Sequence, residues 1–321
     1  MSKVRFFLFL SLTLIIISIA VFSGPRIINP FSLNNTEKEI LLSIRLPRVL
    51  VAVLIGAALG VSGAILQGIL RNPLADPYIL GISSGASLTA AIGLLLGLSN
   101  IGRFSIPVTA FIGASTASLI VGVFGWKRGG LWPERLLLAG VGLSFLFHAC
   151  LILLMSISTD EGLRRSLLWI FGDLAMAEWS LIPFGFLFII TGFFISILRA
   201  KALNALMLGD EFTHSLGFSV NKERVLFFLS MALMTSASVS LGGTIGFVGL
   251  LVPHIVRFFS GADNRYLIPA SGLFGASFLC LADLIGRTAF SPSEIPSGVV
   301  TAIIGSPYFL YLLRRRDVIL S

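Results

Sequence analysis

Charged residues are scarce in this chain of 321 residues, of which only 12% are Asp, Glu, Lys or Arg. Soluble globular domains carry about 25%. Apolar residues make up 56%, and the mean hydropathy of +0.98 excludes a protein that is mainly exposed to water. The net charge of +8 does not indicate nucleic-acid binding either, because no soluble module offers a basic face. The sequence therefore predicts a single membrane domain over residues 1–321.

Residues suited to covalent or metal chemistry are also few. The two cysteines, Cys150 and Cys280, lie in separate apolar runs, and we interpret both as small buried apolar side chains. The three histidines lack a paired spacing such as H-E-x-x-H. His148 lies deep in an apolar run, and we expect it to be hydrogen-bonded within the helix bundle. We predict no catalytic residue and no metal site, and hence no enzyme.

Two direct sources of energy for transport are missing. Carriers coupled to protons or sodium commonly place carboxylates at mid-depth in the membrane, and the apolar runs have almost none. None of the five lysines follows a glycine, so the phosphate-binding loop G-x-x-x-x-G-K-[ST] is absent. A secondary carrier or an intramembrane enzyme is the alternative hypothesis. An ATP-driven transporter would need its ATPase in a separate subunit.

Apolar runs long enough to cross a membrane recur from end to end. A helix needs about 20 mostly apolar residues to span a hydrocarbon core of about 30 Å. Breaks at charged residues, proline and glycine define ten candidate spans: 6–22, 49–70, 78–98, 105–125, 135–157, 180–198, 225–241, 245–259, 267–286 and 296–313. The first exceeds the usual signal-peptide core of about 7 to 15 residues, so we expect it to be retained. The eighth is short for a full crossing.

The distribution of Lys and Arg sets the orientation. With the N-terminus inside, 15 of the 23 basic residues fall on the cytoplasmic side and 8 on the outer side. The positive-inside rule then places both termini in the cytoplasm, which agrees with an even number of spans. In an outer connection, residues 163–174 carry apolar side chains at helical spacing. They predict either a short helix at a pore mouth or an ordered loop.

Glycine is abundant, at 33 residues, and pairs recur at four-residue intervals: Gly56/Gly60, Gly81/Gly85, Gly93/Gly97 and Gly242/Gly246. Small residues at this spacing let helix backbones approach closely in lipid. Most of these pairs therefore predict tight helix packing, and the others mark bends or helix ends.

Three long blocks carry a resemblance to a known family. They run RLPRVLVAVLIGAALGVSGAILQGILRNPLADPYILGISSGASL from Arg45, GGTIGFVGLLVPHIVRFFSGADNRYLIPASGLFGASFLCLAD from Gly242 and EIPSGVVTAIIGSPYFLYLLRRR from Glu294. The chain resembles, from about residue 40 to residue 316, the permeases of type II ATP-binding-cassette importers for iron-siderophore complexes, haem and vitamin B12. The resemblance implies an all-α fold with about ten transmembrane helices per subunit, both termini cytoplasmic, in the inner (cytoplasmic) membrane.

The resemblance also implies partners and a substrate. Such permeases work as homodimers in membrane lipid, with two ATPase subunits and a periplasmic or lipid-anchored binding protein. The chain itself would hold no cofactor, because ATP and Mg are used by the partner ATPase. The expected substrate is a ferric siderophore, with haem, vitamin B12 and the oxyanions molybdate or tungstate as alternatives.

Three arginines match outer-surface positions that receive acidic residues of the binding protein in this family. They are Arg45 and Arg48 in RLPR, and Arg287 shortly before SPSEIP. A planar guanidinium pairs bidentately with a carboxylate, which suits docking. Alternatively, Arg45 and Arg48 could anchor a span end at the membrane surface. Arg287 also lies four residues after Asp283, the spacing of a helical ion pair.

An inner loop matches the short helices that sit in a groove on the ATPase in this family. The residues of the predicted ATPase-coupling loop are Gly209, Asp210, Glu211, Phe212, His214, Leu216 and Gly217. Phe212 and Leu216 are four residues apart, so on a helix they would form one apolar face. A merely solvated loop is the alternative.

Two further inner segments match constrictions of the transport path. Asn72 and Leu74 match the cytoplasmic gate, although a helix stop at Pro73 would explain the same residues. Residues 132–134, Trp-Pro-Glu, stand where the family carries small hydroxyl residues in a second constriction. This departure puts that second gate in doubt.

Overall fold

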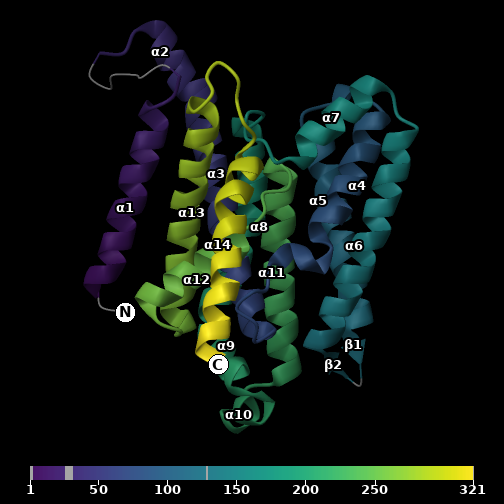
Figure 1. Ribbon diagram of the computed structural model, residues 1–321, viewed down its shortest axis with the longest axis vertical. Coiled ribbons are helices and arrows are strands. Elements are labelled where there is room, and N and C mark those ends of the chain that lie inside the picture. The colour runs from purple at the N-terminus through teal and green to yellow at the C-terminus, as the bar shows by residue number, and fades with distance from the viewer. Residues whose placement is uncertain (1–2, 26–31, 128, 321) are drawn as a thin grey trace.

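The computed structural model describes residues 3–25, 32–127 and 129–320, which form a bundle of helices (Figure 1). Within these residues six helices are long and apolar enough to cross a membrane, and four shorter ones are apolar over 10–17 residues. They correspond to the ten predicted spans: α1 (Lys3–Phe22), α3 (Leu46–Ile69), α4 (Ile82–Leu95), α5 (Ser105–Gly125), α6 (Pro133–Ser156), α8 (Ile182–Leu198), α11 (Val220–Gly242), α12 (Val248–Ser260), α13 (Asn264–Thr288) and α14 (Ser297–Leu320).

Shorter elements lie between these helices. α2 (Asn35–Glu39) and the π-helix η1 (Ile40–Arg45) continue directly into α3. The others are the 3₁₀ turns η2 (Pro77–Leu80), η3 (Leu98–Asn100) and η4 (Trp179–Leu181), the helices α7 (Asp160–Ile170), α9 (Ala200–Leu208) and α10 (Asp210–Ser215), and a hairpin of β1 (Trp126–Lys127) and β2 (Gly130–Leu131).

α3 lies at the centre of the larger part of the bundle, in contact with α13, α11, α12 and α8. α4, α5 and α6 pack together beside it, and α11 joins the two groups through α5 (Figure 1). α1 packs on the outside of α13. The first turn of α1 and the last turns of α14 lie at the same end of the molecule as α10 and the β1–β2 hairpin. Both chain ends therefore lie on the side predicted to be cytoplasmic.

Close backbone contact joins α3 to α13, as the glycine spacing predicts. A Cβ atom on Gly56 would lie 2.2 Å from the carbonyl oxygen of Gly275, and one on Gly275 would lie 2.2 Å from that of Gly56. One turn along, a Cβ on Gly60 would lie 2.4 Å from the Ser271 oxygen. The Gly56/Gly60 pair is therefore a packing face, whereas the positive φ angles of Gly81 and Gly97 mark helix ends.

The seventh and eighth spans are two helices separated by an irregular segment, residues 243–247. Gly243 and Phe247 both have φ angles near +70°, at 69° and 67°, which breaks the helix. α12 then has 13 residues, about 20 Å of helix, and is short, as predicted. Backbone groups exposed by such a break need partners inside the protein. Tyr78 provides one, because its hydroxyl accepts a hydrogen bond from the Ile245 amide at 3.2 Å.

Two sequence-based boundaries are corrected. The third span was expected to begin at residue 78, but α4 begins at Ile82, because the chain first forms the 3₁₀ turn η2 and then turns at Gly81, with φ 78°. The outer segment 163–174 does contain a helix, α7, which begins earlier, where the Thr159 hydroxyl caps the Gly162 amide at 3.3 Å. It ends before Gly172, whose φ is 72°.

The contact between α3 and α13 predicts a strong effect of one methyl group. Gly56→Ala should lower stability by about 1–3 kcal/mol, because the added carbon must push two backbones apart. Gly142→Ala is the matched control, since a Cβ there would meet no atom within 4 Å. Unfolding by SDS in mixed micelles measures both. Equal stability of the two variants would contradict the close contact.

Candidate functional site

The predicted ATPase-coupling loop forms a short exposed helix, α10, at the inner end of the molecule (Figure 1). Gly209, with φ 129°, ends α9 and allows the chain to start α10 at once. Gly217, with φ 79°, follows its last turn. Phe212 and Leu216 are 45% and 54% exposed, so two large apolar side chains face outward. The structure therefore confirms a compact helix with exposed apolar residues rather than an irregular loop.

The first residue of α10 is held by two arginines from other elements. Asp210 accepts a hydrogen bond at 2.6 Å from Arg71, which follows α3, and bonds at 2.7 and 2.9 Å from Arg224 of α11. Bonds between two ionised groups are about twice as strong as neutral ones. α10 is thus fixed to the inner ends of two spans, a pairing that spacing alone did not reveal.

The predicted gate segment lies just after α3. The Asn72 side chain is exposed, and its oxygen accepts a hydrogen bond from the Leu74 amide at 3.0 Å, so the segment forms a tight turn. Leu74 is half-buried, and Pro73 stands where the helix has already ended. The geometry fits either a gate or a helix stop, and the gating role stays a prediction.

A cavity of about 810 Å³ brings the inner segments together. It is bordered by the end of α3, by the β2–α6 connection and by α10 with its neighbours: Ile69, Leu70, Arg71, Gly130, Trp132, Pro133, Glu134, Leu208, Gly209, Asp210, Glu211, Phe212, Ser215, Asn221 and Arg224. Residues 132–134, matched to a second constriction by the resemblance alone, therefore line the same cavity as α10 and the end of α3. Trp132 is half-exposed there and donates a hydrogen bond from its ring nitrogen to the Lys127 carbonyl at 2.8 Å.

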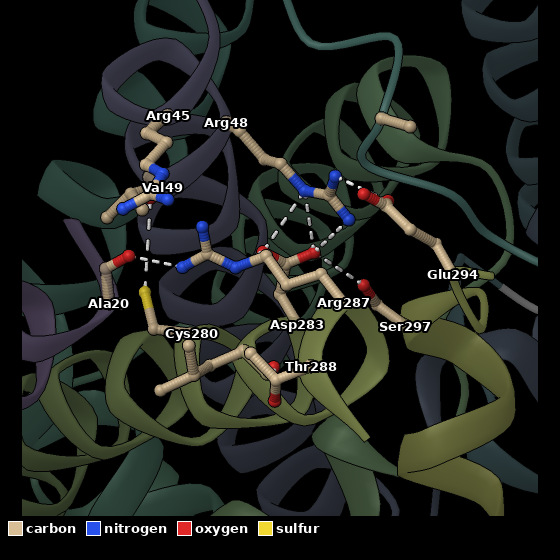
Figure 2. Close-up of polar contacts among 12 residues, drawn as sticks. Ala20, Arg45, Arg48, Val49, Cys280, Asp283, Arg287, Thr288, Glu294 and Ser297 are labelled. Atoms are coloured by element: carbon tan, nitrogen blue, oxygen red, sulfur yellow. Dashed lines mark hydrogen bonds and ion pairs between the residues drawn. The ribbon is translucent and has the colours of Figure 1, made fainter. Parts of the chain in front are cut away.

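The three outer arginines are buried, and the expectation that they lie exposed at the surface is wrong. Arg45, Arg48 and Arg287 are only 5%, 6% and 3% exposed. Their guanidinium groups already have partners within the chain, as Figure 2 shows for Arg48 and Arg287. Docking of a binding protein on these side chains stays a prediction, and it would require an incoming carboxylate to displace partners that are already bound.

Asp283 is the centre of this cluster (Figure 2). Arg48 donates from Nε to its carboxylate at 2.9 and 3.1 Å, and Arg287, one helical turn away, lies at 3.5 Å. The Arg287 contact confirms the helical ion pair suggested by the spacing. Arg48 also bonds to Glu294 at 2.7 Å, and Ser297 donates to Asp283 at 3.0 Å. The cluster thus joins α3, α13 and the start of α14.

Arg45 and Arg287 also hold the end of α1. Arg45 donates to the carbonyl oxygens of Phe22 at 2.9 Å and Val21 at 3.4 Å, and Arg287 donates to that of Ala20. The last carbonyl groups of a helix have no partner within it, and positive charge is favourable there. These two arginines therefore dock the first span onto the bundle.

Residues singled out for possible chemistry have structural surroundings. Cys280 is buried and Cys150 is half-buried, and both are free thiols. His148 is hydrogen-bonded, with Nδ1 2.7 Å from the Ser144 carbonyl of its own helix, but its side chain faces the surface of α6 rather than the bundle interior. In the part of the chain that the structure describes, no group of three or more His, Cys, Asp or Glu could hold a metal ion.

Comparison with known proteins gives consistent matches. The model of the FecCD transport family matches residues 5–315. The hemin transport system permease protein HmuU of Yersinia pestis is 43% identical over 89% of this chain and 86% of its own length. The iron(3+)-hydroxamate import system permease protein FhuG of Bacillus subtilis is 35% identical over 96% and 93%. A solved inward-facing structure, described as a metal-chelate type ABC transporter, is 31% identical with a TM-score of 0.89, over 98% of this chain and all of that one.

The outer cluster predicts a large penalty for losing its single buried acid. Asp283→Asn should lower stability by about 3–5 kcal/mol, because two buried arginines lose their shared counter-charge. Glu294→Gln is the control, since this carboxylate is 42% exposed and exposed pairs contribute about 0–1 kcal/mol. Denaturation by SDS would measure both, and a cluster of minor importance would show two similar, small losses.

Proposed function

The chain belongs to the FecCD transport family, and from this premise we propose how it works as the permease of an ATP-binding-cassette importer. It is a multi-pass protein of the inner membrane that takes a metal chelate from a binding protein and releases it into the cytoplasm. The observation that carries the mechanism is α10, a short exposed helix at the inner end that presents Phe212, with Leu216 directly after it, and is attached to the ends of two spans.

The energy comes from partner subunits. We propose an assembly of two copies of this chain with two ATPase subunits, which use ATP and Mg, and a periplasmic or lipid-anchored binding protein. Phe212 and Leu216 would insert into a groove on each ATPase. A rigid helix pushed from outside can move the spans to which it is fixed, as in other rigid-body transitions. This chain then acts as a gate rather than an enzyme.

Release on the inner side would pass the gate segment. Asn72 and Leu74 carry no charge, so contact between the two copies would close the path without binding the substrate tightly. Residues 132–134 lie across the cavity of about 810 Å³ and would form a second, bulkier constriction. An ATPase-driven shift of α10 would move both.

The substrate class follows from the relatives, which are named for hemin and for iron(3+)-hydroxamate. We propose a ferric siderophore, with haem, vitamin B12 and molybdate or tungstate as the other candidates. The ligand retained by the cognate binding protein, purified from its native cells and identified by mass spectrometry, decides among them. We expect an iron chelate. A sugar or an amino acid would contradict the proposed class.

The apolar face of α10 predicts a measurable contribution to ATPase binding. Phe212→Ala should weaken binding of the purified ATPase by about 2 kcal/mol or more, roughly thirtyfold, because a central aromatic contact is lost. Phe258→Ala is the control, since Phe258 is also exposed, at 84%, but lies on α12. Binding in detergent by surface plasmon resonance gives both values, and equal affinities would place the ATPase contact elsewhere.

A further inference from the structure

Asp210 occupies an unusual position, because one carboxylate joins three separate segments at the inner end. It is the first residue of α10, and its two arginine partners follow α3 and lie in the first turns of α11. Both Asp210 oxygens are used by Arg224, and one of them is shared with Arg71. A displacement of α10 therefore acts on both arginines together.

Arg71 leads directly to the gate segment. It is the residue before Asn72, and it is held in the left-handed backbone region with φ 49°, which few residues other than glycine adopt. Its Nε donates to the Leu206 carbonyl of α9 at 2.8 Å, so the guanidinium group contacts both α9 and α10. The Asn72 amide in turn donates to the Gln67 carbonyl at 3.1 Å, closing the end of α3. A displacement of the Arg71 side chain would therefore act on the backbone directly before residues 72–74.

Arg224 leads to the second constriction. It is only 8% exposed, and its Nη1 donates to the Leu131 carbonyl at 3.3 Å, immediately before residues 132–134. Three residues earlier in α11, Asn221 donates to the Gly129 carbonyl at 2.7 Å and holds the same hairpin. The hairpin is therefore attached to α11 beside the ion pair with Asp210.

Asp210, Arg71 and Arg224 all border the cavity of about 810 Å³, which residues 132–134 also line. The ion pairs are the charged links across this space. Asp210 and Arg71 are 49% and 42% exposed, so their pair contributes little to stability, about 0–1 kcal/mol. Its importance is therefore geometric, since it links α10 to the residue before the gate segment, as the Asp210–Arg224 pair links α10 to the hairpin.

We propose that Asp210 is the positioning residue that transmits movement of α10 to both constrictions, through Arg71 to residues 72–74 and through Arg224 to residues 132–134. The inference rests on the proposed function, because it assumes that an ATPase moves α10. It assigns the transmission to one carboxylate rather than to general packing of the inner end.

The test compares two aspartates at the inner end. Asp210→Asn removes the charge that holds both arginines. Asp263→Asn is the matched control, because Asp263 also stands at a helix start, capping α13, and is paired with Arg265 at 2.6 Å. Hydrogen bonds from Arg265 are the main reason that the pKa of Asp263 is lowered to about 2, so this variant also removes a fixed charge. Asparagine caps a helix as well as aspartate does.

Both variants are measured as the full complex, with ATPase subunits and binding protein, in proteoliposomes. We expect Asp210→Asn to transport about 5- to 150-fold less substrate per ATP hydrolysed, the range typical of coupling between sites. The proposed ATPase contacts, Phe212 and Leu216, are unchanged in this variant. Asp263→Asn should transport normally, and Asp210→Glu should restore part of the loss.

A distance measurement follows the transmission directly. Spin labels at Asn72→Cys in both copies, in a Cys150→Ala background, should report a change in separation on ATP binding. The change should be lost in Asp210→Asn and kept in Asp263→Asn.

Normal transport by Asp210→Asn with the full distance change would overturn the inference. Loss of ATPase binding would overturn it too, because it would place Asp210 in the docking contact. An unmodified complex that neither binds the ATPase nor transports would instead overturn the proposed function and take this inference with it.

Discussion

The structure depends on one constraint of the lipid environment, which is that buried polar groups must find their partners inside the protein. α3 shows how the constraint shapes the fold. Its glycine face lets backbone meet backbone at Gly275, and its outer end is fixed by the bond from Arg48 to Asp283. Its inner end leads to Arg71, which is paired with α10. One central helix thus connects an outer anchor to an inner helix that faces the cytoplasm.

The two ends of α3 carry ion pairs of opposite character. At the outer end, the side chains of Arg48 and Asp283 are 7% and 1% exposed, and charges in such surroundings interact strongly and tolerate little displacement. At the inner end, Arg71 and Asp210 are 42% and 49% exposed, so water competes with their attraction. The outer pair therefore holds α3 firmly within the bundle, whereas the inner pair links α3 to a helix at the surface. This asymmetry suits a permease that an ATPase moves from the cytoplasm.

The sequence predicted the fold well because hydropathy and glycine spacing are local properties. All ten spans, the break at Gly243 and the close contact at Gly56 follow from them. The boundary at residue 78 was wrong because hydropathy does not register the 3₁₀ turn that precedes α4. The short helix that the resemblance implied is likewise present as α10, between Gly209 and Gly217.

The site was less predictable because its pairs are distant in sequence. The burial of Arg48 depends on Asp283 and Glu294, more than 200 residues away, and no spacing indicates that. Asp210 and Arg71 are 139 residues apart, so their pairing could not be predicted from spacing either. Only the Arg287–Asp283 pair, one helical turn apart, could be anticipated.

We propose that this chain is a passive gate driven by a separate ATPase. Uptake of a radiolabelled iron chelate into vesicles tests it most directly, with the purified chain and binding protein present and the ATPase subunits either included or left out. We expect accumulation against a gradient only when the ATPase and ATP are both present. Accumulation by the chain without the ATPase would contradict it.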